Sequence, residues 1–326
     1  MSAKFILAVD QGTSGTKAVV FDDQGRIAAK ATEPLKSYFP RPGFVEQDPR
    51  EIYDNVLAAV QACLREFQLA TSQTVDTIVA CGISNQRETF VLWEESGEPL
   101  CNALVWQCKR SVEICDRLKG SALENEIRRR TGLIVDPYFS GTKLLWLKEN
   151  DSRIAEAIHA GRALFGTIDT WLLYKLTAGR SYLTDHTNAS RTLLFNIDQL
   201  QWDRHLLDQF GFQGLRLPDA KPSSWDYGRT DFGGLLPQAI PISAMIGDSH
   251  AAAFGEGCFS SGAAKATLGT GCSILLNTGA KRIEPTQGTV ATICWSMPGR
   301  VDYALEGIIV TCGATIQWLR DQLGLF

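Results

Sequence analysis

A polar turn follows the first apolar run of the chain, and its residue types suit phosphate. It reads Asp10-Gln11-Gly12-Thr13-Ser14-Gly15-Thr16-Lys17. Gly12 lets backbone N–H groups approach an anion, and the hydroxyls of Thr13 and Ser14 add donors. Asp10 ends the apolar run, where its carboxylate can hold Mg²⁺ through water. Lys17 can reach a phosphate, although the pattern favours a solvent-facing side chain. The alternative is an ordinary hairpin turn with a capping aspartate.

This turn differs from the two common nucleotide-binding loops, because neither G-x-x-x-x-G-K-[ST] nor G-x-G-x-x-G occurs in the chain. A second turn of similar composition lies in the second half and reads Leu268-Gly269-Thr270-Gly271-Cys272-Ser273. Two such turns, one in each of two similar domains, would hold a nucleotide from both sides of a cleft. By itself, the second is an ordinary glycine turn.

A polar segment that includes Arg87 and Glu88 follows the apolar residues 77–83. Polar groups at the end of a buried strand usually face a crevice where ligands bind. Arg87 can donate hydrogen bonds to the hydroxyls of a polyol, and Glu88 can accept them. The alternative is a surface turn with an exposed ion pair.

An aspartate stands between a predicted strand and a helix of small residues, in Gly247-Asp248-Ser249-His250. Asp248 is either a helix cap or a base that takes a proton from a hydroxyl. A hydrolase triad is rejected, because adjacent helical residues point about 100° apart and no G-x-S-x-G motif occurs. Trp106 and Tyr138 could form the wall of a pocket for a small carbon skeleton, with plain core aromatics as the alternative.

The elements that position these residues follow from hydrophobic period and turn signals. Residues 5–10, 17–22 and 26–32 predict an antiparallel meander of strands. A helix is predicted over 49–67, with Asp48 as its cap, and a buried strand over 77–84. In the first half, helices are also predicted over 110–130 and 143–159, followed by a buried run over 164–177. An irregular connection over 218–241 leads to a domain boundary near Ile246. The second half then begins with a helix over 249–257 and a hairpin over 263–279.

Composition narrows the class of protein. The 326 residues carry a formal net charge of −4, which gives no electrostatic reason to expect binding to nucleic acid or to an anionic membrane. The nine cysteines form no C-x-x-C pair, which favours unpaired thiols in a reducing compartment. Since the first apolar run is too short for a signal peptide and no run of about 18 apolar residues occurs, a cytoplasmic protein is expected.

Eight segments, taken together, resemble the glycerol kinases of the FGGY carbohydrate kinase family. They are DQGTSGTKAVVFD, GISNQRETFVLW, NALVWQCKR, TGLIVDPYFSGTKLLWLKEN, FGTIDTWLLYKLT, TDHTNASRTLLFNI, LGTGCSILLNTG and YALEGIIVTCGATIQWLRD. Residues 138–150 match the first signature of that family. The resemblance implies an α/β fold of two ribonuclease-H-like domains around a cleft, as in actin and hexokinase. It places an N-terminal domain for polyol and phosphate at 1–246 and the beginning of a C-terminal domain, incomplete, at 247–326.

The resemblance also implies ATP and Mg²⁺ as cofactors and assigns residues to them. Asp248 is the expected catalytic base, and Asp10 and Asp248 are the expected metal ligands. The residues expected to contact the polyol or sugar are Arg87, Glu88, Trp106, Tyr138, Asp248, Ser249 and Ser273. The residues expected to contact the nucleotide are Gly12, Thr13, Ser14, Lys17, Thr270, Gly313 and Gln317. Either a homodimer or a homotetramer fits the family.

Two small side chains depart from the family pattern. Ser249 stands where these kinases usually carry glutamine, and Ser273 stands where they usually carry phenylalanine. Both changes enlarge the expected pocket, which keeps a four- or five-carbon polyol or ketose open beside glycerol. Because family members are longer, the chain is expected to be a fragment or a truncated protein. A non-catalytic protein that binds a polyol or a partner is therefore a third interpretation.

Overall fold

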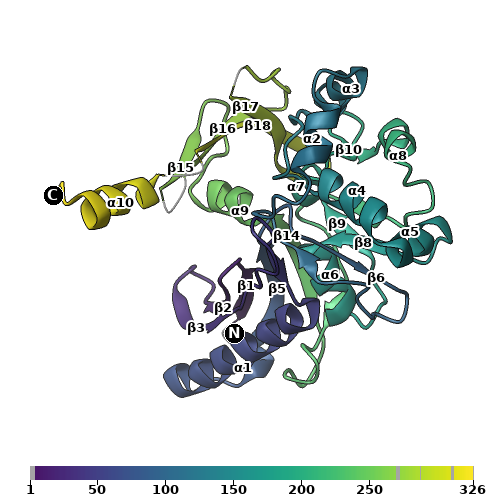
Figure 1. Cartoon of the computed structure of the whole chain (residues 1–326). Helices are drawn as coiled ribbons and strands as arrows, with labels where there is room; N and C mark the ends of the chain where they lie inside the picture. Colours follow the sequence, from purple (N-terminus) through teal and green to yellow (C-terminus); the bar gives the residue numbers. More distant parts are fainter. Residues whose placement is uncertain (1–3, 269–271, 287, 310–311, 326) are drawn as a thin grey trace.

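The computed structural model describes residues 4–268, 272–286, 288–309 and 312–325. Its largest sheet has the strand order β13-β14-β5-β1-β2-β3 (Figure 1). These strands are β1 (Phe5–Gln11), β2 (Gly15–Phe21), β3 (Ile27–Pro34), β5 (Ile78–Asn85), β13 (Arg229–Thr230) and β14 (Ile240–Gly247). The predicted meander is confirmed, because β2 pairs antiparallel with both β1 and β3.

The centre of this sheet is parallel, and that arrangement places the polar segments. β5 runs parallel to both β1 and β14, with Asn85 opposite Gln11 on one side and Gly247 on the other. The three strands therefore end at one edge of the sheet. The chain continues from that edge into the turn after β1, the Arg87–Glu88 segment and Asp248, as expected for a ligand-binding edge.

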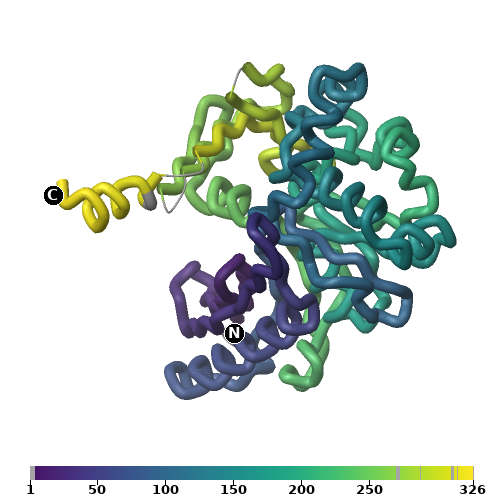
Figure 2. Tube along the Cα trace, viewed as in Figure 1, coloured from purple at the N-terminus to yellow at the C-terminus, as the bar shows by residue number. Residues whose placement is uncertain are grey.

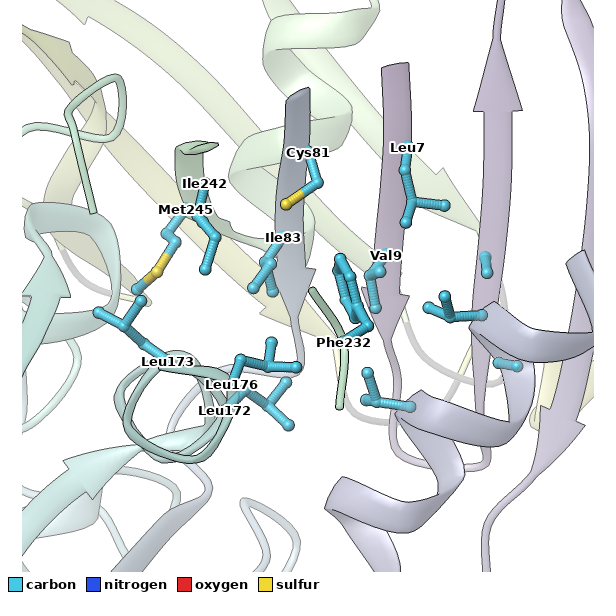
Figure 3. Close-up of a cluster of buried hydrophobic side chains, with 14 of the residues drawn as sticks. Leu7, Val9, Cys81, Ile83, Leu172, Leu173, Leu176, Phe232, Ile242 and Met245 are labelled. Atoms are coloured by element: carbon cyan, nitrogen blue, oxygen red, sulfur yellow. The ribbon is translucent and has the colours of Figure 1, made fainter. Parts of the chain in front are cut away.

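Two helices cover one face of this sheet, α1 (Pro49–Thr71) and α6 (Ile168–Leu176). α1 begins as predicted, because the Asp48 carboxylate accepts a hydrogen bond from the N–H of Arg50. Its apolar residues recur every three or four positions and face the sheet. Figure 3 shows this cluster, in which Leu172 and Leu176 of α6 lie beneath Ile83 of β5.

A second body packs beside this sheet around the strand order β4-β7-β6-β8. Its elements are β4 (Glu46–Gln47), β6 (Phe90–Trp93), β7 (Ala103–Leu104), β8 (Leu164–Thr167), α2 (Val112–Leu118), α3 (Ala122–Thr131), α4 (Ser140–Asn150), α5 (Ser152–His159) and α8 (Arg204–Phe210). The run 164–177 is buried as predicted, but only β8 lies in this body. The rest of that run, α6, packs with α1.

The single helices predicted over 110–130 and 143–159 are wrong, since each is two helices. The first breaks at Gly120, whose φ of +75° suits a residue without Cβ. Ser121 then caps α3 by accepting from the N–H of Glu124, and Glu124 accepts from the N–H of Gly120. The second breaks at Asp151, whose carboxylate accepts from the first N–H groups of α5.

The last part of the chain forms an antiparallel sheet in the order β15-β16-β18-β17. Its elements are β15 (Ala264–Leu268), β16 (Cys272–Gly279), β17 (Thr289–Met297), β18 (Arg300–Ile309), α9 (Asp248–Gly255) and α10 (Gly313–Leu323). The predicted hairpin is confirmed as β15 and β16. α9 connects the two larger sheets, and α10 projects away from the rest of the chain (Figure 2).

The connection over 218–241 is mostly irregular, as predicted, although it buries Tyr227, Phe232 and Leu236. The short elements elsewhere are η1 (Val75–Thr77), β9 (Leu183–Asp185), α7 (His186–Ala189), β10 (Phe195–Asn196), β11 (Gln201–Trp202) and β12 (Asp219–Lys221). The boundary near Ile246 falls where β14 gives way to α9, and it stays a prediction. Among the described residues, no helix combines the length and the apolarity needed to span a membrane.

Candidate active site

A cavity of about 820 Å³ opens at the edge where β1, β5 and β14 end. It is bounded on one side by the second body and on the other by the sheet of β15–β18. Eight residues predicted from the sequence line it: Thr13, Arg87, Glu88, Trp106, Tyr138, Asp248, Ser249 and Ser273. The structure therefore brings the predicted polyol residues together, from segments that lie far apart in the chain.

Arg87 and Glu88 sit in a tight turn directly after β5. The N–H of Thr89 donates to the Arg87 carbonyl at 2.7 Å, and Glu88 has a φ of +60°. A non-glycine residue holds this conformation only where its surroundings require it. Here the Ser140 hydroxyl donates to the Glu88 carbonyl at 2.8 Å. Both side chains are buried, so the exposed ion pair considered from the sequence is excluded.

Asp248 is the first residue of α9, and its carboxylate faces Arg87. Arg87 Nε lies 3.3 Å from Asp248 Oδ1, and the N–H of Ser249 donates to the same oxygen at 2.6 Å. Gly247 makes this approach possible, because a Cβ there would lie 2.7 Å from Arg87 Cγ. Burial raises the pKa of Asp248, and the nearby Arg87 charge opposes that rise. The result is a carboxylate that accepts protons more readily than an ordinary aspartate.

Two charged residues at the site were missed by the sequence analysis, Arg191 and Glu306. Arg87 Nη2 donates to Glu306 Oε1 at 2.7 Å, and Arg191 Nε donates to Glu88 Oε1 at 2.6 Å. Ser273 also donates to Glu306 Oε1, at 3.1 Å. Glu306 had a usable signal, because it occupies an inward-facing position of β18, between apolar residues of that strand. Arg191 follows a polar stretch and gave no comparable signal.

The aromatic wall is also ordered by hydrogen bonds. Trp106 Nε1 donates to Thr13 Oγ1 at 2.8 Å, and the Trp106 and Tyr138 rings meet edge to face with centroids 5.6 Å apart. Both rings line the cavity, which disfavours the alternative of plain core aromatics. Thr13 in turn donates to Gln86 Oε1 at 3.2 Å. The turn after β1 is thus connected directly to the aromatic wall of the cavity.

Lys143, which the sequence did not predict, binds the backbone of the segment that carries Tyr138. Its ammonium donates to the carbonyls of Pro137, Tyr138 and Phe139 at 2.7, 2.7 and 3.1 Å. Burial lowers the pKa of Lys143 to about 8. Three acceptors for one buried ammonium fix the backbone that carries Tyr138.

Apart from Thr13, the turn after β1 does not line the cavity. The N–H of Gly12 donates to the Gly15 carbonyl at 2.9 Å, and a Cβ at Gly15 would lie 2.6 Å from the Glu33 carbonyl oxygen. Ser14 is exposed, and the Lys17 side chain is 63% exposed, as predicted, 4.0 Å from Asp10 Oδ2. Asp10, Gly12, Ser14 and Lys17 are not part of the cavity lining.

The remaining predicted nucleotide residues lie elsewhere. Thr270 is outside the described residues. Gly313 and Gln317 belong to α10, which projects away from the rest of the chain (Figure 1) and contributes no residue to the cavity lining. No group of three or more His, Cys, Asp or Glu side chains in the described part of the chain is placed to hold a metal ion. Asp10, whose Oδ1 accepts from Ser84 at 3.0 Å, is half exposed and open to a hydrated ion.

Comparison with known proteins decides the family. Residues 5–255 match the N-terminal domain of the FGGY family of carbohydrate kinases. The chain belongs to this family. This FGGY chain is 46% identical over 326 residues to a glycerol kinase of Carboxydothermus hydrogenoformans, covering all of the chain and 64% of that protein. It is 45% identical over 324 residues to a glycerol kinase of Bacillus mycoides, with 99% and 64% covered.

Solved structures agree on the fold. The FGGY chain superposes on a Plasmodium falciparum glycerol kinase with ADP at a TM-score of 0.92 and 35% identity, covering 98% of the chain and 64% of that protein. A gluconate kinase of Lactobacillus acidophilus gives a TM-score of 0.86 at 24% identity, with 99% and 63% covered, which supports the fold alone. The predicted α/β fold is confirmed. The chain spans about 64% of the length of the relatives it matches.

Proposed function

We propose that this protein transfers the γ-phosphoryl group of ATP to a primary hydroxyl of a small polyol, with glycerol as the first candidate. The observation that carries the proposal is the pairing of Asp248 with Arg87 in a cavity lined by further groups that recognise hydroxyls. Glu88 offers an acceptor there, and Tyr138 and Trp106 offer an apolar wall. The relatives named glycerol kinase, and the solved one with ADP, support the same reaction.

In the proposed mechanism Asp248 removes the hydroxyl proton of the polyol. The freed oxygen attacks the γ-phosphorus, its bond to phosphorus forms, and the bond from phosphorus to the β–γ bridging oxygen breaks to release ADP. Arg87 orients the polyol through its Nη1, which is buried and has no hydrogen-bond partner in the described residues. Positioning by these buried groups would supply most of the acceleration.

The turn after β1 is the proposed phosphate site. The backbone of Thr13 and Ser14 and the exposed Ser14 hydroxyl are proposed to donate to phosphate oxygens. Gly12 keeps the turn tight through its N–H bond to the Gly15 carbonyl, and Lys17 adds an exposed positive charge. Asp10 and Asp248 fit Mg²⁺ bound through one or two carboxylates, water and phosphate oxygens, the usual manner of this ion in phosphoryl transfer. When bound, the ion would screen the charge on the phosphates. Thr270, Gly313 and Gln317 are proposed to contact the nucleotide from the second domain.

Three further predictions remain with this proposal: domains at 1–246 and 247–326, a cytoplasmic location and a homodimer or homotetramer. The nine cysteines, all within the described residues, are unpaired, which supports a reducing compartment.

A longer polyol or a small ketose is the second candidate, favoured by two small side chains at the cavity. Ser249 and Ser273 both line it, and its volume of about 820 Å³ exceeds what a three-carbon triol requires. Ser273 and Arg87 both donate to Glu306 Oε1, and Arg87 also pairs with Asp248. The small Ser273 side chain therefore lies in the same cluster as the proposed base.

The test measures ADP release with polyols and ketoses of three to six carbons, with the same compounds titrated in a binding assay. Release with glycerol or erythritol that Asp248→Asn abolishes supports the proposal. Polyol binding without any ADP release would favour the non-catalytic interpretation. Absence of both would refute the assignment of this cavity.

A further inference from the structure

Arg191 is a fully buried charge close to the cavity, but it does not line the cavity. Its side chain has no exposed surface, and it lies between two buried carboxylates. Arg191 Nε donates to Glu88 Oε1 at 2.6 Å. Arg191 Nη2 lies 2.6 Å from Glu306 Oε2, an ion pair without the alignment of a hydrogen bond. The guanidinium also lies 5.1 Å from the centre of the Phe139 ring.

This placement makes Arg191 a junction between separate chain segments. Glu88 belongs to the turn after β5, Glu306 to β18, and Phe139 to the segment that carries Tyr138. Each of these partners is tied to a residue of the cavity wall. Glu88 lines the cavity itself, Glu306 binds Arg87 and Ser273, and Phe139 adjoins Tyr138.

The charges alternate through the cluster in the order Glu88, Arg191, Glu306, Arg87, Asp248. Burial alone would raise the pKa of Glu306, but Arg191 and Arg87 outweigh it and hold that pKa well below its usual range. Without Arg191, Glu88 would lose its ion pair and Glu306 would keep only the pair with Arg87. Glu306 would then take up a proton more readily, and Glu88 would no longer be held in its present position.

We propose that Arg191 and Glu306 are positioning residues that fix Arg87 and Glu88 for polyol binding without touching the polyol. Glu306 holds Arg87 Nη2, so that Nη1 is left as the donor for a substrate hydroxyl. Arg191 holds the carboxylate of Glu88, the residue whose backbone has a positive φ. This inference rests on the proposed function, because it assumes that the cavity binds a polyol.

The experiment compares Arg191→Met, Arg191→Lys and Glu306→Gln with the unsubstituted chain. Glycerol and erythritol binding is measured by calorimetry, ATP binding in parallel, and Tm as a control for folding. We expect Arg191→Met to weaken polyol binding about tenfold to a hundredfold, the range for losing hydrogen bonds to a charged group. ATP binding should change by less than about threefold. Arg191→Lys should recover part of the loss, because it keeps the charge but not both contacts.

Arg282→Met is the matched control. Arg282 also contacts two carboxylates, Asp198 at 2.6 Å and Glu284 at 3.4 Å, and its side chain is only 9% exposed. It lines no part of the cavity. This variant should lower Tm and leave polyol binding unchanged.

A pH series adds a readout that a merely structural role would not change. In Arg191→Met the polyol affinity should fall toward acid at a higher pH than in the unsubstituted chain, because Glu306 loses one of the two arginine charges that hold its pKa down. The titratable groups that face the cluster from outside it are Tyr138, Lys143, His250 and Lys265. They are present in both proteins, so the difference between the two profiles isolates the loss of Arg191.

The outcomes separate two failures. If no polyol binds the unsubstituted chain, the proposed function is wrong and this inference falls with it. If polyols bind and Arg191→Met binds them within twofold, only the positioning role is wrong. Equal loss of polyol and ATP affinity would also overturn it. Should Arg191→Met not fold, Arg191→Lys and Glu306→Gln decide by the same criteria.

Discussion

The two sides of the proposed active site are built differently. On the proposed polyol side, Arg87 is 4% exposed and lies between two carboxylates, whereas on the proposed phosphate side Lys17 is 63% exposed with one distant partner. A neutral polyol brings no charge that could order the protein around it, so its donors and acceptors must be fixed beforehand. ATP brings its own charge, and backbone N–H groups with a mobile lysine can meet it. Substitutions should therefore act separately on the two sides.

The largest expected effect is at the proposed base. Asp248→Asn should lower turnover by about 10²–10⁴ while polyol affinity changes little, because asparagine keeps the shape and cannot take the proton. Steady-state kcat together with calorimetric binding measures both quantities. Near-normal turnover in this variant would remove Asp248 from its role.

The pH dependence of the unsubstituted enzyme should show the same group. Because the pKa of Asp248 is raised, the base becomes protonated, and inactive, at a higher pH than an ordinary aspartate with a pKa of about 3.9. The value of kcat/KM should fall about tenfold per pH unit below that raised pKa. An acid limb that begins only near pH 4 would show that Asp248 has the pKa of a solvent-exposed carboxylate.

Arg87→Ala tests the separation of the two sides most directly. Loss of its donors should weaken polyol binding by about 1.5–3 kcal/mol, roughly tenfold to more than a hundredfold. ATP binding should stay intact, because no phosphate-turn residue bonds to Arg87. Calorimetric titration with each ligand measures both. Equal losses would mean that the two sides act as one site.

The sequence predicts the scaffold better than the balance of charges around the cavity. The meander follows from alternation and glycine turns, and the start of α1 from Asp48 and Pro49, because these signals are local. The breaks at Gly120 and Asp151 also had local signals, a glycine before a capping serine and an aspartate cap, which the prediction of single helices overlooked.

The contacts that complete the polyol side are not local. Arg191 reaches Glu88 across 103 positions, and Arg87 reaches Glu306 across 219. The local sequence around each of these residues does not indicate which distant residue it contacts. The positive φ of Glu88 is likewise invisible, because tertiary contacts rather than residue type enforce it. Which residues meet in the cavity could be expected from the family resemblance, but not how their charges are balanced.

The smallest expected effect concerns Ser249 and Ser273, two small side chains that line the cavity. If both leave space beside Asp248, erythritol or a small ketose should be used within about tenfold of glycerol, a gap of ~1.4 kcal/mol. The double change Ser249→Gln with Ser273→Phe should restore a strict preference for glycerol, because it fills that space. Phenylalanine cannot donate to Glu306, yet Glu306 keeps both arginines, so the ion-pair cluster should survive.

The deciding measurement is the ratio of kcat/KM for glycerol and erythritol on both forms. Arg282→Met, which changes no residue of the cavity lining, serves again as a control and should leave the ratio unchanged. A natural form that already rejects erythritol a thousandfold would mean that other side chains fill the space, so that the two serines set no preference. If the double variant changes this kcat/KM ratio and keeps its ATP affinity, the proposed polyol side alone selects the length of the substrate. Neither Ser249 nor Ser273 belongs to the turn after β1.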